Sequence, residues 1–128
     1  MIQNRLPHDH GQTIEHELEY MPSVENFQTI ANIFKQLGYG IRIHIFWLLC
    51  HCEECVINLS AMVNMSSPAV SHHLKQLKSA GLIVSRRDGK EVYYKAADTE
   101  QARNFHHMIE WLVKIACPSQ VETQKGTP

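Results

Sequence analysis

A mainly α-helical domain with one small β-hairpin is the fold class that the sequence predicts, and three observations support it. Apolar residues recur at helical spacing in several segments between residues 24 and 80. The apolar period then changes to two over residues 82–87 and 91–95, which predicts two strands. Asp88-Gly89 lies between them, and this pair is typical of a tight hairpin turn because glycine accepts a positive φ.

About five helices are expected, and several have a recognisable start or stop signal. Ser23 can cap the first helix, and Gly38-Tyr39-Gly40 ends it. Ser66-Ser67-Pro68 is a start signal because a capping serine precedes a proline in the first turn, and Asn64 can end the helix before it. Cys52-Glu53-Glu54 is expected to be a connection. The four later helices are expected over residues 41–50, 56–63, 67–80 and 98–116.

Length and composition suit one folded domain. The chain has 128 residues, of which 44% are hydrophobic and 20% charged, an ordinary globular balance. We expect residues 1–21 to form a flexible, acidic, His-rich arm, residues 22–117 the dimer-forming domain, and residues 118–128 a polar tail. The sequence has no apolar run of the roughly 18 residues that a membrane span needs, and no apolar signal core at its start. A cytoplasmic location, in which the four cysteines stay reduced, is therefore expected.

Charge is distributed unevenly although the formal net charge is only −1. Residues 1–25 contain five carboxylates against one arginine, a balance of −4. Residues 66–95 contain six lysines and arginines against two carboxylates, a balance of +4. This basic middle segment can meet an anionic partner.

Helix 67–80 has two chemically different faces. Val70, Leu74 and Leu77 fall on one face, which predicts core positions, while the opposite face is polar and basic. Two short helices followed by a hairpin outline a winged helix-turn-helix, whose second helix enters the major groove of DNA. A solvated helix face with an exposed hairpin is the alternative interpretation. The predicted DNA-contacting residues are Ser66, Ser67, Ser71, His72, Lys75, Gln76, Arg86, Arg87 and Lys90.

These segments resemble a known family. The stretch from Met65 to Leu77, with its Val-Ser-His-His-Leu motif, and the stretches 80–83 and 86–94 are similar to the recognition helix, strand and wing of the ArsR/SmtB family of bacterial repressors. The resemblance covers residues 34 to 112 and implies a homodimer, a palindromic double-stranded DNA operator and release of DNA by an inducer. The family's second helix usually opens with Asp-Pro before its arginine. Here Gly38-Tyr39-Gly40-Ile41 precedes Arg42, which is expected to alter a turn rather than the fold.

Dimerisation is also expected from the apolar pattern of the first and last helices. Each shows more apolar surface than one small core can cover. A monomer that buries these side chains in its own core is the alternative. The side chains expected to lie between two copies are Phe27, Phe34, Phe105, Ile109 and Leu112.

The cysteines point to an inducer. Cys50, Cys52 and Cys55 fall within six residues, and thiolates are soft ligands that suit zinc, cadmium, lead, copper(I) or arsenite. The three sulfurs are therefore the predicted site for one soft metal or metalloid ion. The alternative is that Cys50 packs in the core while Cys52 and Cys55 are incidental thiols. The family's usual metal motif, Glu-Leu-Cys-Val-Cys-Asp-Leu, is matched at Cys55, but Ile57 replaces its second cysteine.

Histidines could contribute to other metal sites. The N-terminal arm offers His8, His10 and His16 as additional ligands, or these residues belong to a disordered arm. The family's last-helix zinc site is expected to be missing, because Asp98 matches but other residues replace the remaining ligands. His106 and His107 could simply face solvent. The replacing residues are Glu100, Trp111 and Lys114.

Three other functions are alternatives to metal sensing. Some members of the family sense oxidants or persulfides with two cysteines, and Cys50 and Cys117 lie in the corresponding elements, each about one turn later. An enzyme is not expected, because the sequence lacks a glycine-rich phosphate loop, a His-Glu-x-x-His motif and a nucleophile elbow. A structural zinc module is disfavoured because such sites usually have two separated ligand pairs.

Overall fold

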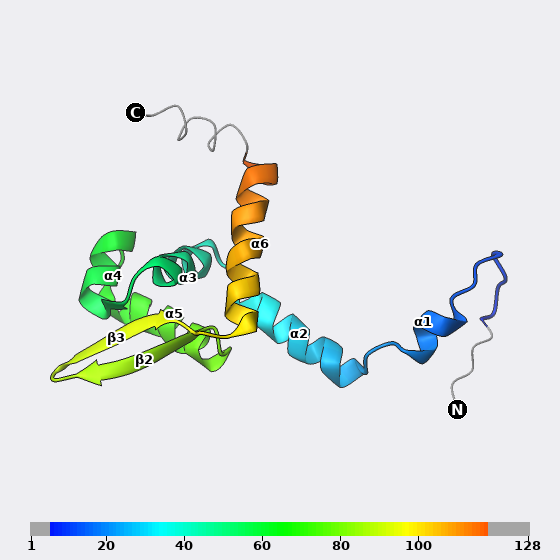
Figure 1. The fold of residues 1–128 in the computed structure, drawn as a ribbon, viewed down its shortest axis with the longest axis horizontal. Helices are drawn as coiled ribbons and strands as arrows, with labels where there is room; N and C mark the ends of the chain where they lie inside the picture. Colours follow the sequence, from blue (N-terminus) through cyan, green and yellow to red (C-terminus); the bar gives the residue numbers. More distant parts are fainter. Residues whose placement is uncertain (1–5, 118–128) are drawn as a thin grey trace. The chain divides into compact units, whose positions relative to one another are not determined.

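Residues 6–117 are described in a computed structural model of the protein, and they form six helices and three strands (Figure 1). The chain divides into two compact units, residues 1–32 and 33–128. The elements in chain order are α1 (Glu15–Glu19), α2 (Val24–Gln36), α3 (Gly40–His51), β1 (Glu54–Cys55), α4 (Val56–Val63), α5 (Ser67–Ser79), β2 (Ile83–Asp88), β3 (Glu91–Ala96) and α6 (Glu100–Ala116).

The short helix α1 was not expected, so residues 6–117 contain one helix more than the sequence predicts. It buries no residue, so its sequence carries no apolar period from which a helix could be predicted. Glu15 and Glu17 lie in its first turn, where the positive end of the helix dipole favours carboxylates. The rings of His16 and Tyr20 pack with their centroids 4.6 Å apart. This ring contact is local to α1 and its C-terminal neighbour.

Helix ends follow the predicted signals. The Ser66 side chain accepts a hydrogen bond from the backbone N–H of Ala69 at 3.3 Å, and Pro68 follows in the first turn of α5. Ser23 caps α2 in the same way, through the N–H of Asn26 at 3.1 Å. Asn64 ends α4 in the left-handed region, with φ of 56° and ψ of 50°. The sequence predicted each of these ends.

The sheet is larger than the predicted hairpin. Strands β2 and β3 pair antiparallel around the Asp88-Gly89 turn, as expected, and Gly89 has φ of 64°. Strand β1 joins the free edge of β3, so the order is β1-β3-β2, with Cys55 opposite Tyr93. The connection predicted for Cys52-Glu53-Glu54 therefore ends in a strand. Two residues are too few to show a period of two, so the pattern could not reveal it.

The core lies where α3, α4 and α5 pack against the base of the hairpin. Val70, Leu74 and Leu77 on α5 are at most 1% exposed, which confirms the predicted inner face of that helix. The other fully buried large side chains come from α3, α4, the turn before β2 and the first residue of β2: Ile45, Phe46, Leu59, Leu82 and Ile83. This core fixes α5 against the hairpin, so the polar face of α5 points away from it.

Apolar side chains remain exposed on α2 and α6. Helix α2 has no buried residue, and Ala102 is the sole buried residue of α6. Phe34 is 54% exposed although its ring meets that of Phe105 edge-on, and Leu112 is 42% exposed. Both helices thus carry apolar surface that the described chain does not cover, as the sequence predicted. No helix in residues 6–117 has both the length and the apolar character needed to cross a membrane.

The left-handed conformation of Asn64 leads to a stability prediction. Asn64→Ala should lower the free energy of unfolding by about 1 kcal/mol, because a Cβ-bearing residue without asparagine's local hydrogen bonding is strained there. Asn64→Gly should leave it nearly unchanged. Urea unfolding at one protein concentration measures both variants, and an equal loss in the two would contradict the prediction.

Candidate functional site

The exposed face of α5 carries the side chains that the sequence predicted for reading DNA. Ser71, His72 and Lys75 are exposed, on the side of the helix away from its buried leucines, and Gln76 is half-buried beside them. Serine, histidine and glutamine side chains can donate to or accept from base edges, whereas lysine attracts phosphate. The face is polar, accessible and held on a helix whose other side is locked in the core.

Two predicted contact residues at the start of α5 have local partners. Ser66 uses its hydroxyl oxygen to cap the helix. The hydroxyl of Ser67 lies 3.2 Å from that of Ser60 on α4. Ser60 also donates to the backbone carbonyl of Val56, at 2.7 Å. These hydroxyls therefore help to set the angle between α4 and α5.

A buried arginine that the sequence analysis did not single out holds α5 in place. Arg42, on α3, is only 6% exposed. Its Nε donates to Nδ1 of His73 at 3.0 Å, and its Nη1 donates to Oε1 of Gln36. Its guanidinium also lies over the ring of Tyr39, 4.7 Å from the centroid. Burial lowers the pKa of His73, and the charges of Arg42 and His72 lower it further. Nδ1 must be unprotonated to accept from Arg42, so the hydrogen bond selects the neutral ring.

The three cations predicted on the wing differ in whether they already have a partner. Arg86 is held by Glu53, with Nε and Nη2 donating to the two carboxylate oxygens at 2.8 Å each. Its guanidinium also stacks over Tyr93, 4.8 Å from the centroid. The hydrogen bonds from Arg86 lower the pKa of Glu53. Arg87 and Lys90 are exposed and form no ion pair with the residues of 6–117, so their charges are available to an anion.

The four cysteines occupy different environments. Cys55 is buried in β1, Cys50 and Cys52 are half-buried, and Cys117 is exposed. Cys52 donates its thiol to the carbonyl of Leu48 at 3.2 Å. Burial, with a contribution from Glu110, raises the pKa of Cys50 to about 11, and burial also raises that of Cys52.

The predicted three-sulfur site is not assembled in the described chain. Cys50 and Cys52 line a cavity of about 310 Å³, to which Cys55 does not contribute. Among residues 6–117, the sulfurs of Cys50, Cys52 and Cys55 do not form a group within ligand reach of one another.

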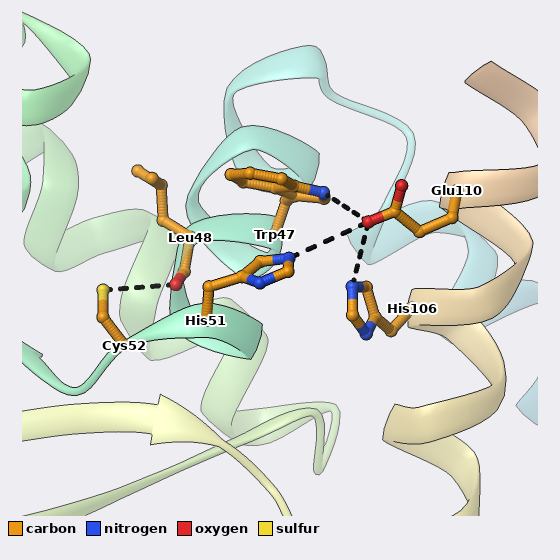
Figure 2. Close-up of polar contacts among 6 residues, drawn as sticks. All are labelled: Trp47, Leu48, His51, Cys52, His106 and Glu110. Carbon is orange, nitrogen blue, oxygen red and sulfur yellow. Dashed lines mark hydrogen bonds and ion pairs between the residues drawn. The ribbon is translucent and has the colours of Figure 1, made fainter. Parts of the chain in front are cut away.

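A compact polar cluster lies instead between α3 and α6 (Figure 2). Glu110 Oε1 accepts from Trp47 Nε1 at 3.0 Å and lies 3.2 Å from His106 Nε2. His51 Nε2 lies 3.8 Å from the same oxygen. The hydrogen bond from Trp47 lowers the pKa of Glu110, helped by His106 and His51.

His106, for which the sequence analysis allowed a solvent-facing position, is half-buried in this cluster. It also did not connect His51 with His106, since 55 positions separate them. The i, i+4 spacing of His106 and Glu110 was the local signal that could have placed these two on one helix face.

The positions of the family's last-helix site do not join this cluster, and the N-terminal histidines lie in the other unit of the chain. His8, His10 and His16 belong to the first unit of the chain. Asp98 is bound by Arg103 Nη1 at 2.7 Å, and Glu100 is exposed. Trp111 and Lys114 are exposed on α6.

The comparisons with known proteins agree with this architecture. Residues 40–85, from the start of α3 into β2, match the family described as bacterial regulatory protein, arsR family. A transcriptional repressor SmtB homolog from Synechocystis is 33% identical over 90 residues, covering 70% of this chain and 68% of that protein. The chain belongs to the ArsR family. It is accordingly a transcriptional regulator with a winged helix-turn-helix fold.

This ArsR-family chain is also similar to one further curated relative and to one solved structure. A cadmium resistance transcriptional regulatory protein CadC from Listeria innocua is 39% identical over 72 residues, covering 54% of this chain and 60% of that protein. A homodimeric winged helix-turn-helix DNA-binding domain from Mycobacterium bovis superposes with a TM-score of 0.64 at 28% identity. That match covers 70% of this chain and 82% of the mycobacterial chain.

The neutral ring of His73 leads to a pH prediction. Because its folded-state pKa lies below the usual 6.5, the unfolded chain takes up the proton more readily. The stability that the Arg42–His73 contact contributes is therefore present above pH 6.5 and is lost as the pH falls below that value. His73→Asn keeps an acceptor but does not titrate.

The loss of unfolding free energy between pH 7.5 and 5 should accordingly be smaller in His73→Asn than in the parent protein. Urea unfolding at the two pH values measures the difference. The matched change at an exposed histidine of α3, His44→Asn, should keep the parent slope. An unchanged pH dependence in His73→Asn would contradict a neutral His73.

Proposed function

We propose that this ArsR-family protein is a repressor that binds a palindromic operator as a homodimer and leaves it when an inducer ion binds through its cysteines. The observation that carries DNA binding is the α5 face, with Ser71, His72 and Lys75 exposed on a helix fixed by the core and by Arg42. Arg87 and Lys90 on the wing add free positive charge at a second position. One face for bases and one tip for phosphates is the arrangement that a winged helix needs.

The homodimer is supported by the apolar surfaces of α2 and α6. Phe34, Trp111 and Leu112 are 54%, 59% and 42% exposed, and a second copy would remove them from water. At roughly 25 cal/mol per Å² of apolar area, a few such side chains contribute several kcal/mol per protomer. The homodimeric mycobacterial neighbour has the same fold. Two copies related by a twofold axis would read two half-sites of a palindrome.

The inducer that we propose is a soft metal or metalloid ion held by Cys50, Cys52 and Cys55. The three sulfurs are close in sequence, and the Listeria relative is named for cadmium resistance. Binding would need Cys50 and Cys52 to lose their protons and Cys52 to leave the carbonyl of Leu48. Metal binding favours the loss of these protons, because the ion binds the thiolate and not the thiol.

Binding at these cysteines would reach the wing through Glu53. This residue follows Cys52 directly and holds Arg86 of β2 with both carboxylate oxygens. A rearranged Cys52–Cys55 segment would therefore pull on the wing. An ion that induces release 100-fold must bind the DNA-free shape more tightly by about 2.7 kcal/mol.

Substitutions on α5 and the wing separate base reading from phosphate attraction. Ser71→Ala or His72→Ala should weaken operator binding more than binding to unrelated DNA, because these side chains address base edges. Arg87→Ala should weaken both and lower the salt slope of log K by roughly one unit. Fluorescence anisotropy over a salt series measures these effects, and His44→Ala on α3 is the control. An equal loss on both DNAs from the Ser71 and His72 changes would contradict the assignment of base reading.

Cysteine substitutions test the inducer. Cys55→Ser should keep operator binding but abolish its release by cadmium, because one thiolate of three is lost. Cys117→Ser should release DNA as the parent protein does. Anisotropy of the operator complex during a cadmium titration measures release. If the essential set is Cys50 and Cys117 alone, the protein senses oxidants or persulfides through a pair of thiols instead.

A further inference from the structure

We propose that His51, His106 and Glu110 form a second metal site, which binds a borderline divalent ion such as zinc, cobalt or nickel and joins α3 to α6 within one protomer. Each residue offers one ligand atom, and these atoms all lie within 4.8 Å of one another. The site uses none of the cysteines and none of the positions of the family's last-helix site. Its occupancy can be tested without DNA, so it stands or falls independently of the proposed repressor function.

The spacing of the ligand atoms suits a small divalent ion. Zinc binds imidazole nitrogen and carboxylate oxygen at about 2.0–2.1 Å, so tetrahedral ligand atoms stand about 3.4 Å apart. Glu110 Oε1 lies 3.2 Å from His106 Nε2 and 3.8 Å from His51 Nε2. Movements of a few tenths of an ångström would bring these two pairs to ligand spacing.

The backbone brings the three residues together from two elements. His106 and Glu110 are one turn apart on α6, and the i, i+4 spacing places both side chains on the same face. His51 is the last residue of α3. Its ring meets that of His106 edge-on, with centroids 4.9 Å apart. Figure 2 shows the side chains of both helices converging on the Glu110 carboxylate.

Trp47 acts as a positioning residue for this carboxylate. It lies one turn before His51 on α3, and its Nε1 donates to Glu110 Oε1 at 3.0 Å. Its ring also packs against His51, with centroids 4.2 Å apart. A ligand carboxylate that is hydrogen-bonded from outside is typical of metal sites, because the second contact fixes its orientation. The tryptophan therefore restrains two of the three ligands.

The donor atoms determine which ions fit. Two imidazoles and a carboxylate suit zinc, cobalt and nickel, whereas copper(I), cadmium and lead prefer thiolate. Cys52 is turned away from the cluster, toward the carbonyl of Leu48 (Figure 2). The His51 and Glu110 side chains are 45% and 43% exposed, so an ion can enter from solvent and a water can complete the coordination. A cluster that only exchanges hydrogen bonds would not distinguish among these ions.

The experiment uses the whole chain, reduced and metal-free, with cobalt(II) as the probe, in a Cys55→Ser parent that lacks the proposed three-sulfur site. We expect one ion per protomer with visible ligand-field bands and no thiolate-to-cobalt charge-transfer band, and displacement by zinc. His106→Gln, His51→Gln and Glu110→Gln should each weaken cobalt binding about tenfold or more. His107→Gln, at the exposed neighbour on α6, is the matched control and should bind as the parent does. Circular dichroism checks that each variant is folded.

Tryptophan fluorescence locates the ion. The chain has two tryptophans, so Trp111→Phe leaves Trp47 as the sole emitter. Cobalt(II) should quench this emission in the Trp111→Phe protein, and His106→Gln added to it should abolish the quenching at the same cobalt concentration. Absence of cobalt binding, a thiolate charge-transfer band in the Cys55→Ser protein, or equal loss in His106→Gln and His107→Gln would each overturn the proposal.

Discussion

One buried guanidinium joins the segments that orient α5. Arg42 is the one charged side chain buried among residues 6–117, and a buried cation without partners would be strongly unfavourable. It is satisfied by a neutral His73 on α5, by Gln36 and by the face of Tyr39. Because His73 is adjacent to the exposed His72, the same contact that solves the burial of Arg42 also fixes the turn of α5 that presents His72 to solvent. The aliphatic core packs against the inner face of α5, and the Arg42–His73 hydrogen bond fixes the rotation of α5 about its own axis.

The parts of the fold that the sequence predicted are those encoded by neighbouring residues. A capping serine with a following proline, an Asp-Gly turn and a leucine face of period 3.6 are all local patterns, so α5 and the wing could be placed before any coordinates. Strand β1 and helix α1 are too short to produce a period. Arg42 and His73 are 31 positions apart, and His51 and His106 are 55 apart, so their meeting depends on how the helices pack. Patterns along the chain do not contain that information.

The candidate sensor regions differ in how ready they are for an ion. Burial and nearby carboxylates raise the pKa of the Cys50 and Cys52 thiols, and Cys55 is buried in β1. An ion bound there would have to rearrange the end of α3, which is a cost but also a means of transmitting a signal. The His51, His106 and Glu110 atoms already converge and would need small movements. A site whose ligand atoms already converge favours a high affinity for the ion. A site that forms only when the chain rearranges couples ion binding to a change of conformation.

The placement of the two regions makes them complementary rather than redundant. Residues 50–55 run from the end of α3 to the sheet, and Glu53 within them holds Arg86 of the wing. His51 lies in the same segment but contacts Glu110 of α6. The apolar side of α6 is proposed to meet the second protomer. One short segment thus contacts the wing through one residue and α6 through another. An ion that changes the conformation of this segment would alter both contacts at once, because the backbone between His51 and Glu53 is too short to absorb the movement.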